Sequence, residues 1–150
     1  MNATTLLRQQ HKQVRDLFKK VEKTENANQR RTLLDRIAGE LQVHTKIEEE
    51  IFYPAVRGLG TEKAEEMIME ALEEHHVVDL VLAELPEVDP EDERFEAKMT
   101  VLSELVDHHA KEEEQEMFKT AQRLGRATLD DLGKRMEMRA RELMRQPRAA

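Results

Sequence analysis

Two histidine–glutamate pairs are the clearest candidates for chemistry in this sequence. His44 is followed four residues later by Glu48, and His109 is followed four residues later by Glu113. Residues four apart lie on one face of a helix, so each pair presents an imidazole and a carboxylate together. The chain has no cysteine, which excludes disulfides, thiolate metal sites and cysteine nucleophiles. Any metal must therefore be held by His, Asp and Glu.

A lone histidine precedes each pair at nearly the same distance. His11 lies 33 residues before His44, and His75 lies 34 residues before His109. We interpret this as an internal repeat of two helix pairs. Each repeat would consist of a helix with one histidine and a following helix with a histidine and a glutamate.

Two of the histidines belong to doublets, and only one member of each doublet can face the interior. Apolar residues follow His75, but not His76, at the same three offsets as they follow the first histidine of the chain. We therefore expect His75 to point inward. The residues after His109 match those after His44 better than the residues after His108 do, so we assign His109. The other two histidines are expected at the surface or at helix interfaces.

Four imidazoles and two carboxylates inside one helical domain need a compensating partner. Burying ionised carboxylates without partners is costly, and a metal centre would compensate them. Six ligands are too many for one tetrahedral zinc and too few for two closed octahedra. We expect two Fe ions, bridged by carboxylates and an oxo or hydroxo group, with open coordination positions. The expected metal ligands are four terminal imidazoles and two bridging carboxylates: His11, His44, His75 and His109, with Glu48 and Glu113.

The composition indicates that helices position these residues. Charged residues make up 37% and hydrophobic residues 39% of 150, with only five Gly and four Pro. Apolar residues recur at steps of three and four in four long segments. The fold class that this pattern predicts is all-α, an up-down-up-down four-helix bundle with an appended C-terminal helix. The four expected helices cover approximately residues 2–24, 29–57, 61–85 and 89–124.

Local signals suggest where the later helices begin and end. The segment Asp89–Glu93 is typical of a helix start, with Asp89 as a cap, Pro90 in the first turn and acids at the positive helix end. We expect Thr128 to cap the fifth helix and Pro147 to follow its end. We divide the chain into a bundle over residues 1–124 and a basic C-terminal helix and tail over 125–150.

Charge is unevenly distributed along the chain. The formal net charge is −8, yet residues 119–150 hold nine Lys or Arg and four Asp or Glu, a net of +5. The acidic remainder argues against nucleic acid or a membrane as a partner. The basic segment would either neutralise the acidic body or contact a protein partner. The sequence contains no long apolar run and no signal-peptide pattern, so we expect a cytoplasmic protein.

These motifs resemble the hemerythrin-like, or HHE cation-binding, domain. The matching stretches are Leu6–His11, His44–Pro54, Glu74–His75 and His109–Phe118, and the resemblance covers about residues 1–124. The resemblance implies a non-haem di-iron centre in a four-helix bundle. It also implies roles that range from reversible oxygen binding to sensing of oxygen or iron and handling of peroxide or nitric oxide.

The sequence departs from the oxygen-carrying hemerythrins. Asp79 stands four residues after His75, where those proteins have another histidine, and the last acid is Glu113 in place of an Asp one position later. Gln10 precedes the first histidine where many relatives have an acid, and we interpret it as peripheral. We assign Asp79 a place outside the ligand set and Tyr53 ordinary packing at the bundle end. Direct contact of either with the metal centre stays open.

From these features we expect a non-haem di-iron protein that binds or reacts with O2, peroxide or nitric oxide. Its role would be oxygen or redox sensing, or a response to oxidative or nitrosative stress. The alternative is an iron-responsive protein-interaction module without turnover, read by a partner through the basic C-terminal helix. The sequence contains no Ser/His/Asp arrangement and no glycine-rich phosphate loop, so hydrolase and nucleotide-binding functions have no support.

Overall fold

The computed structural model describes residues 1–146 and confirms the expected all-α class. No strand occurs among these residues, and none of their helices is long and apolar enough to cross a membrane. Pro147, expected to follow the last helix, lies outside the described residues. Five helices have 20 to 23 residues each: α1 (Ala3–Glu22), α2 (Ala27–Ile47), α4 (Glu62–Glu84), α5 (Glu93–Glu112) and α7 (Arg126–Arg145). Shorter helical segments are α3 (Tyr53–Arg57), α6 (Phe118–Ala121) and the 3₁₀ turns over Leu85–Glu87 and Gln122–Leu124.

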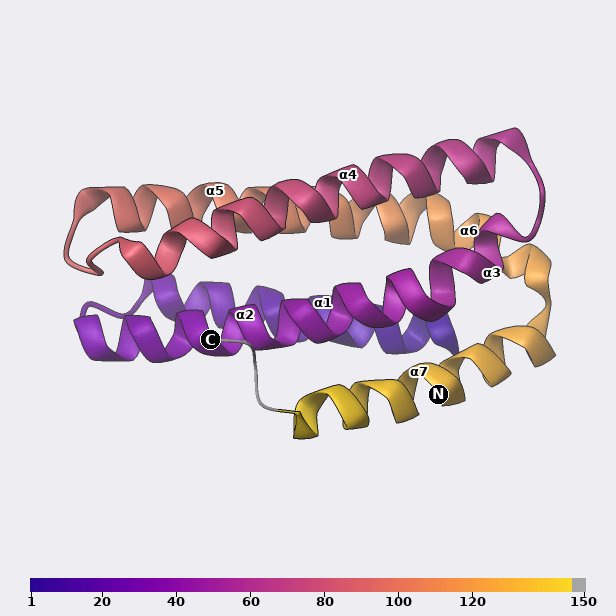
Figure 1. Cartoon of the computed structure of the whole chain (residues 1–150), viewed down its shortest axis with the longest axis horizontal. Coiled ribbons are helices and arrows are strands. Elements are labelled where there is room, and N and C mark those ends of the chain that lie inside the picture. The colour runs from indigo at the N-terminus through magenta and orange to yellow at the C-terminus, as the bar shows by residue number, and fades with distance from the viewer. Residues whose placement is uncertain (147–150) are drawn as a thin grey trace.

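The long helices run side by side along the long axis of the molecule (Figure 1). The pair α1 and α2 faces the pair α4 and α5. Helix α7 returns along the side of α1 and α2 that is opposite to α4 and α5. The first helix pair is therefore covered on both sides, whereas the outer face of the second pair is open to solvent.

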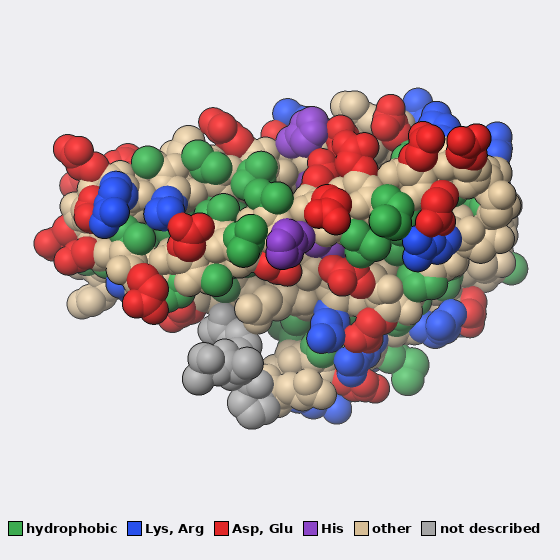
Figure 2. Space-filling model, turned by 45° about the horizontal axis from the view of Figure 1, so that its top comes forward, with side chains coloured by type: hydrophobic (Ala, Val, Ile, Leu, Met, Phe, Trp, Pro, Cys, Tyr) green, Lys and Arg blue, Asp and Glu red, His purple; other side chains and the backbone are tan. Residues whose placement is uncertain are grey.

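The open face of α4 and α5 mixes apolar and acidic side chains. Met69, Val77 and Leu80 of α4 and Val101 of α5 are exposed there. Figure 2, in which the top of Figure 1 comes forward, shows apolar side chains scattered between acidic ones on this side. Single apolar side chains on a surface are normal and need no partner to explain them.

Side-chain caps begin most of the long helices, with one start displaced from the expected position. Asn2, Asn26 and Thr61 each accept a hydrogen bond from a backbone N–H in the first turn. Helix α5 begins after Asp92, so the expected start at Asp89 and Pro90 is wrong. Asp89 accepts a hydrogen bond from the backbone N–H two residues on, and this local turn comes before the helix.

The start of α7 also differs from the expected one. Gly125 has φ +89°, a conformation that other residues rarely adopt, and Arg126 follows it directly as the first helical residue. The backbone N–H of Leu129 donates to the carbonyl of Gly125. Thr128 therefore lies within the first turn and is not the cap. The chain reverses at Gly125 without needing a polar side chain to begin the helix.

Two π turns interrupt the helices that carry the histidine–glutamate pairs. They cover Glu48–Phe52, named η1, and Glu113–Met117, named η3. The backbone N–H of Tyr53 donates to the carbonyl of Glu48, five residues earlier. The equivalent bond joins Phe118 to Glu113. Such turns are rare and occur frequently at functional sites.

A polar layer separates two apolar cores along the bundle. One core lies at the end where α7 packs, and the other fills the opposite end. Helices α1, α2, α4 and α5 each contribute one buried histidine to the layer between the cores. Representative residues are Leu7, Ile47, Phe52, Phe118 and Met136 in the first core, and Phe18, Ile37, Leu41, Phe95 and Leu102 in the second.

Candidate metal centre

The structure brings all six expected metal ligands together in the polar layer. Their side chains are buried: the four histidines are 3% to 7% exposed, Glu48 is 0% and Glu113 is 1% exposed. They form two groups, in each of which one possible ligand atom per residue lies within 4.8 Å of the others. Position A consists of His11, His44, Glu48 and Glu113, and position B consists of Glu48, His75 and His109.

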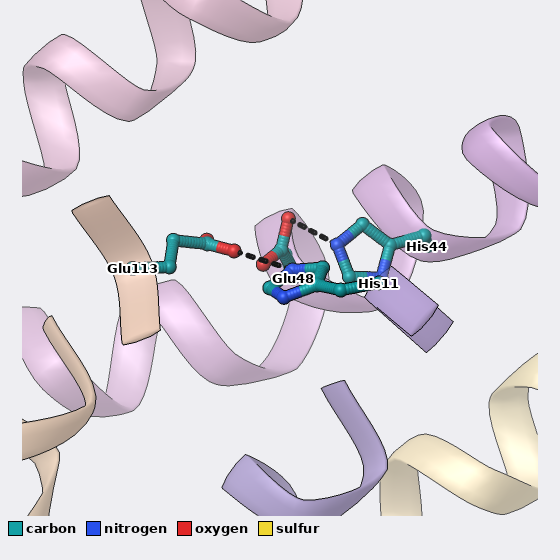
Figure 3. A group of neighbouring side chains, drawn as sticks. All are labelled: His11, His44, Glu48 and Glu113. Carbon is teal, nitrogen blue, oxygen red and sulfur yellow. Dashed lines mark hydrogen bonds and ion pairs between the residues drawn. The ribbon is translucent and has the colours of Figure 1, made fainter. Parts of the chain in front are cut away.

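Position A lies between α1, α2 and the two π turns (Figure 3). The Nε2 atom of His11 lies 3.0 Å from Glu113 Oε1, and the Nε2 atom of His44 lies 3.3 Å from Glu48 Oε1. Each carboxylate thus faces one imidazole of this position.

Position B has the same type of geometry. The Nε2 atom of His75 lies 3.1 Å from Glu48 Oε1 and 3.2 Å from the Nε2 atom of His109. The other oxygen of Glu113, Oε2, lies 3.3 Å from His109 Nε2. Two donors held about 2.1 Å from one ion lie roughly 3 Å apart, so these separations suit a shared ion.

The outer nitrogen of each imidazole is already occupied. Each Nδ1–H donates a hydrogen bond to a side-chain oxygen, which leaves the Nε2 lone pair directed into the site. Three acceptors are carboxylates and the fourth is an amide. The bonds join His11 to Glu114 at 2.7 Å, His75 to Glu49 at 2.7 Å, His109 to Glu74 at 2.6 Å and His44 to Gln10 at 2.6 Å.

The interpretation of Gln10 as peripheral, made from the sequence, is therefore wrong. Its Oε1 atom is the acceptor that orients His44. The residue lies one position before His11 on α1, and this helical position faces α2 across the helix pair. A sequence signal was present, because Glu74 occupies the same position before His75.

Two buried polar atoms in position A have no hydrogen-bond partner: His44 Nε2 and Glu48 Oε2. Buried polar atoms without partners are uncommon and costly, and each requires an explanation. Both atoms belong to expected metal ligands and lie in the same group. A set of neutral imidazoles and carboxylates, two of whose atoms lack partners, fits divalent iron.

The pKa values of the site residues are strongly displaced. Burial lowers the pKa of His44 to about 4. Burial also acts to lower the pKa of His11 and His75, but Glu113 and Glu48 respectively outweigh it and raise both.

The pKa values of His109 and Glu113 are displaced more strongly, in opposite directions. Burial acts to lower the pKa of His109, yet Glu113 raises it well above the ordinary value. Burial acts to raise the pKa of Glu113, yet His109 holds it well below the ordinary value. Without metal, the carboxylates therefore raise the pKa of three imidazoles, whereas burial lowers the pKa of His44.

Tyr53 enters the centre, although the sequence interpretation favoured ordinary packing. Its hydroxyl donates to Glu113 Oε2 at 2.6 Å and lies 3.2 Å from Glu48 Oε1. The same oxygen lies 3.2 Å from His75 Nε2 and 3.3 Å from His109 Nε2. Burial, together with the charges of Glu113 and Glu48, raises the pKa of Tyr53 well above 10, so the hydroxyl keeps its proton in the metal-free protein.

The remaining candidates lie outside the centre. His76 and His108 are exposed, and Asp79 is exposed on α4. Burial raises the pKa of Asp79, with Glu49 contributing in the same direction. Asp79 belongs to neither group of possible ligands.

Two small spaces adjoin the centre. A cavity of about 30 Å³ lies against all four imidazoles, with apolar walls from Val14, Leu41, Val78 and Val106. A crevice between α4 and α5 reaches His109 and Glu113 from the surface. The crevice is lined by acids that would attract cations: Glu70, Glu74, Glu112 and Glu116.

Comparisons with known proteins agree with this geometry. The sequence model of the Hemerythrin HHE cation binding domain matches residues 2–121. Uncharacterized proteins from Mycobacterium tuberculosis and Mycobacterium bovis are 30% identical over 150 residues, which covers 98% of this chain and 90% of each relative. The crystal structure of a Hemerythrin HHE cation binding domain-containing protein from Mycobacterium kansasii matches with a TM-score of 0.84 and 27% identity. That match covers 95% of this chain and 87% of the other.

Proposed function

The chain belongs to the family of hemerythrin HHE cation-binding domains, and we propose that it is a non-haem di-iron protein that binds or reacts with O2, peroxide or nitric oxide. The observation that supports this most directly is the convergence of four imidazole Nε2 atoms on two buried carboxylates. The two atoms without hydrogen-bond partners, on His44 and Glu48, lie in the same place.

In this proposal the two groups of side chains hold one iron each. His11 and His44 serve position A, His75 and His109 serve position B, and Glu48 and Glu113 are shared. We further propose that α1, α2 with α3, α4, and α5 with α6 are the up-down-up-down four-helix bundle, and that α7 is the appended helix. Two such irons, when bound, supply redox equivalents and open coordination positions for a small ligand.

The protein's own residues restrict which ligand can arrive. The cavity beside the imidazoles, of about 30 Å³, is large enough to hold a molecule the size of water. Its apolar walls favour small uncharged molecules and exclude larger organic substrates. This supports O2, peroxide and nitric oxide as the ligand class.

Tyr53 supplies a buried hydroxyl proton beside both carboxylates. Its hydroxyl donates to Glu113 and lies beside Glu48. We assign it the role of holding a proton at Oη for transfer to a bound ligand, which the reduction of peroxide or O2 requires.

We place this activity in the cytoplasm, in oxygen or redox sensing or in protection against oxidative or nitrosative stress. Four imidazoles, in place of the larger set that oxygen carriers use, support a reactive or sensing role over oxygen transport. Asp79, which stands where those carriers have another histidine, is exposed and outside both groups.

Metal analysis of the aerobically loaded protein tests the proposal. We expect two irons per chain and a near-ultraviolet charge-transfer absorption, both lost in Glu113→Ala. Glu104→Gln, an exposed acid elsewhere on α5, is the matched control and should keep both irons. Less than one iron per chain, unaffected by Glu113→Ala, contradicts the proposal.

A second candidate, the iron-responsive interaction module, is favoured by one contact. Arg139 of α7 binds the Glu50 carboxylate through two nitrogens, at 2.7 Å and 3.2 Å. Glu50 lies in the π turn that begins with Glu48. A change in the turn on metal binding would therefore reach the basic helix. Metal-dependent protease resistance of α7 without turnover of any of the three ligands distinguishes this candidate.

A further inference from the structure

The hydrogen bonds around the centre follow the internal repeat residue by residue. The acid that follows each shared glutamate accepts from the lone histidine of the other helix pair. Glu49, after Glu48, accepts from His75, and Glu114, after Glu113, accepts from His11. The same hydrogen bond from an imidazole to an acid therefore occurs once in each half of the internal repeat.

The repeat is broken at the residue that precedes each lone histidine. Glu74, before His75, accepts from His109 at 2.6 Å. Gln10, before His11, accepts from His44 at the same distance. The geometry is retained while a carboxylate is replaced by a neutral amide. Position B therefore has two carboxylates behind its imidazoles, and position A has one.

Cations reduce the charge at position A further. Arg15 lies 3.3 Å from the Glu114 carboxylate, and Arg8 lies 4.0 Å from it. Within residues 1–146, no Lys or Arg forms an ion pair with Glu49 or Glu74. The single acid behind position A therefore has two arginines beside it, whereas the two acids behind position B have only histidines beside them, including the exposed His108 at 3.8 Å from Glu74.

The shared carboxylates do not offset this difference. Glu48 belongs to both groups, and Glu113 places one oxygen 3.0 Å from His11 and the other 3.3 Å from His109. The two positions therefore differ in the charge of the side chains that accept hydrogen bonds from the Nδ1–H groups of their imidazoles. A carboxylate behind an imidazole makes the imidazole a stronger donor to a cation, and such partners change metal affinity by about 10- to 100-fold.

We infer that the two metal positions are unequal, so that position B fills first and tightly while position A binds a second, exchangeable ion. Gln10 is the positioning residue that sets position A apart. The inference rests on the proposed two-metal function and adds an order of loading to it. It also predicts a stable form of the protein with one ion per chain, held by His75 and His109.

Anaerobic titration with Co²⁺, followed by calorimetry and visible absorption at pH 8.5, tests this order. We expect two steps whose dissociation constants differ by about tenfold or more. His44→Ala should remove the weak step and keep the tight one. Gln10→Glu should tighten the weak step by about tenfold, and Glu49→Gln should weaken the tight step by a similar factor. Because Gln10→Glu is expected to strengthen binding, partial unfolding cannot imitate its effect.

Two variants control for charge alone. Gln13→Glu adds an acid to α1 at an exposed position, and Glu66→Gln removes an exposed acid from α4. Neither should change either step. Two equal steps that Gln10→Glu leaves unchanged overturn the inference and leave the proposed function standing. A wild-type protein that binds no Co²⁺ and no Fe²⁺ overturns both.

Discussion

The α1–α2 pair and the α4–α5 pair arrange their histidines almost identically. The rings of His11 and His44 have centroids 4.9 Å apart and planes at 65°, and those of His75 and His109 are 4.8 Å apart, also at 65°. The aromatic residues that follow the π turns complete the likeness. Phe118 stacks on His11 and Tyr53 stacks on His75.

The pairs differ in what surrounds this common arrangement. Tyr53 brings a hydroxyl to the histidines of α4 and α5, whereas Phe118 brings only an apolar ring to His11. Helix α7 covers α1 and α2 and leaves the outer face of α4 and α5 open. A repeated ligand scaffold can therefore give two chemically distinct positions when only the residues around it change.

The largest expected effect comes from Glu48, which belongs to both groups of possible ligands. Glu48→Ala should abolish binding at both positions, because Glu48 belongs to both groups of ligands. His44→Ala should remove one ion only. Iron per chain, measured after anaerobic loading and desalting, separates the two outcomes. One ion retained in Glu48→Ala would show that the positions are independent.

Substitution of the two stacked aromatic residues tests the difference between Tyr53 and Phe118. Tyr53→Phe should lower the rate of peroxide consumption by about 100-fold or more, because the buried proton donor is lost. It should also destabilise the metal-free protein by about 1–3 kcal/mol, since Glu113 loses its hydrogen bond. Stopped-flow rates and urea unfolding are the measurements. Phe118→Tyr is the matched change at position A, and equal rates in both variants would contradict the assignment.

The packing of α7 on α1 and α2 can be disturbed by a substitution that changes none of the expected metal ligands. A Cβ atom at Gly133 would lie 2.0 Å from the carbonyl oxygen of Met1, so Gly133→Ala forces α7 away from the N-terminal segment. Overpacking of this kind costs about 1–3 kcal/mol. We expect a lower urea midpoint and faster proteolysis within α7, with the ion of position B retained. Lys134→Ala, at an exposed neighbour, should behave as wild type.

The smallest effect concerns protons. At position B the pKa values of His75 and His109 are both raised, whereas at position A only that of His11 is raised and that of His44 is lowered to about 4. Without metal, position B therefore binds protons more readily than position A. A metal ion must displace those protons. The affinity for the metal therefore rises with pH, until the pH exceeds the raised pKa values. The slope should be steeper for position B than for position A. Titration between pH 6.5 and 8.5 should therefore show the two steps moving apart, and parallel slopes would contradict this.

The helical period was sufficient to predict the all-α class and to decide which member of the first histidine doublet faces inward, whereas His109 was chosen over His108 from the internal repeat. Apolar residues at three- and four-residue steps lie beside His75, and the structure buries it while His76 stays exposed. Repetition along the chain allowed the six candidate ligands to be chosen together. Their binding of metal remains a prediction.

The same period could not predict Tyr53. In an α-helix a residue five positions after Glu48 points away from it, but the π turn brings Tyr53 above Glu48 through an i to i+5 hydrogen bond. Pro54 is compatible with this turn because it has no N–H to donate to Glu50. The second turn forms with Lys119 at the matching position, so proline alone is not the signal.

The π turns also determine how the chain can change in length. In each ligand helix the aromatic residue lies nine positions after the histidine, Tyr53 after His44 and Phe118 after His109. Deleting one residue within the turn, such as Glu50, would let a regular α-helix form in which Tyr53 follows Glu48 by four positions and still lies on its face. The ring and the core residues after it would keep their places together. Each π turn therefore accommodates one extra residue, so a deletion inside it should be less damaging than a deletion elsewhere in the same helix, which would rotate all later residues by about 100°.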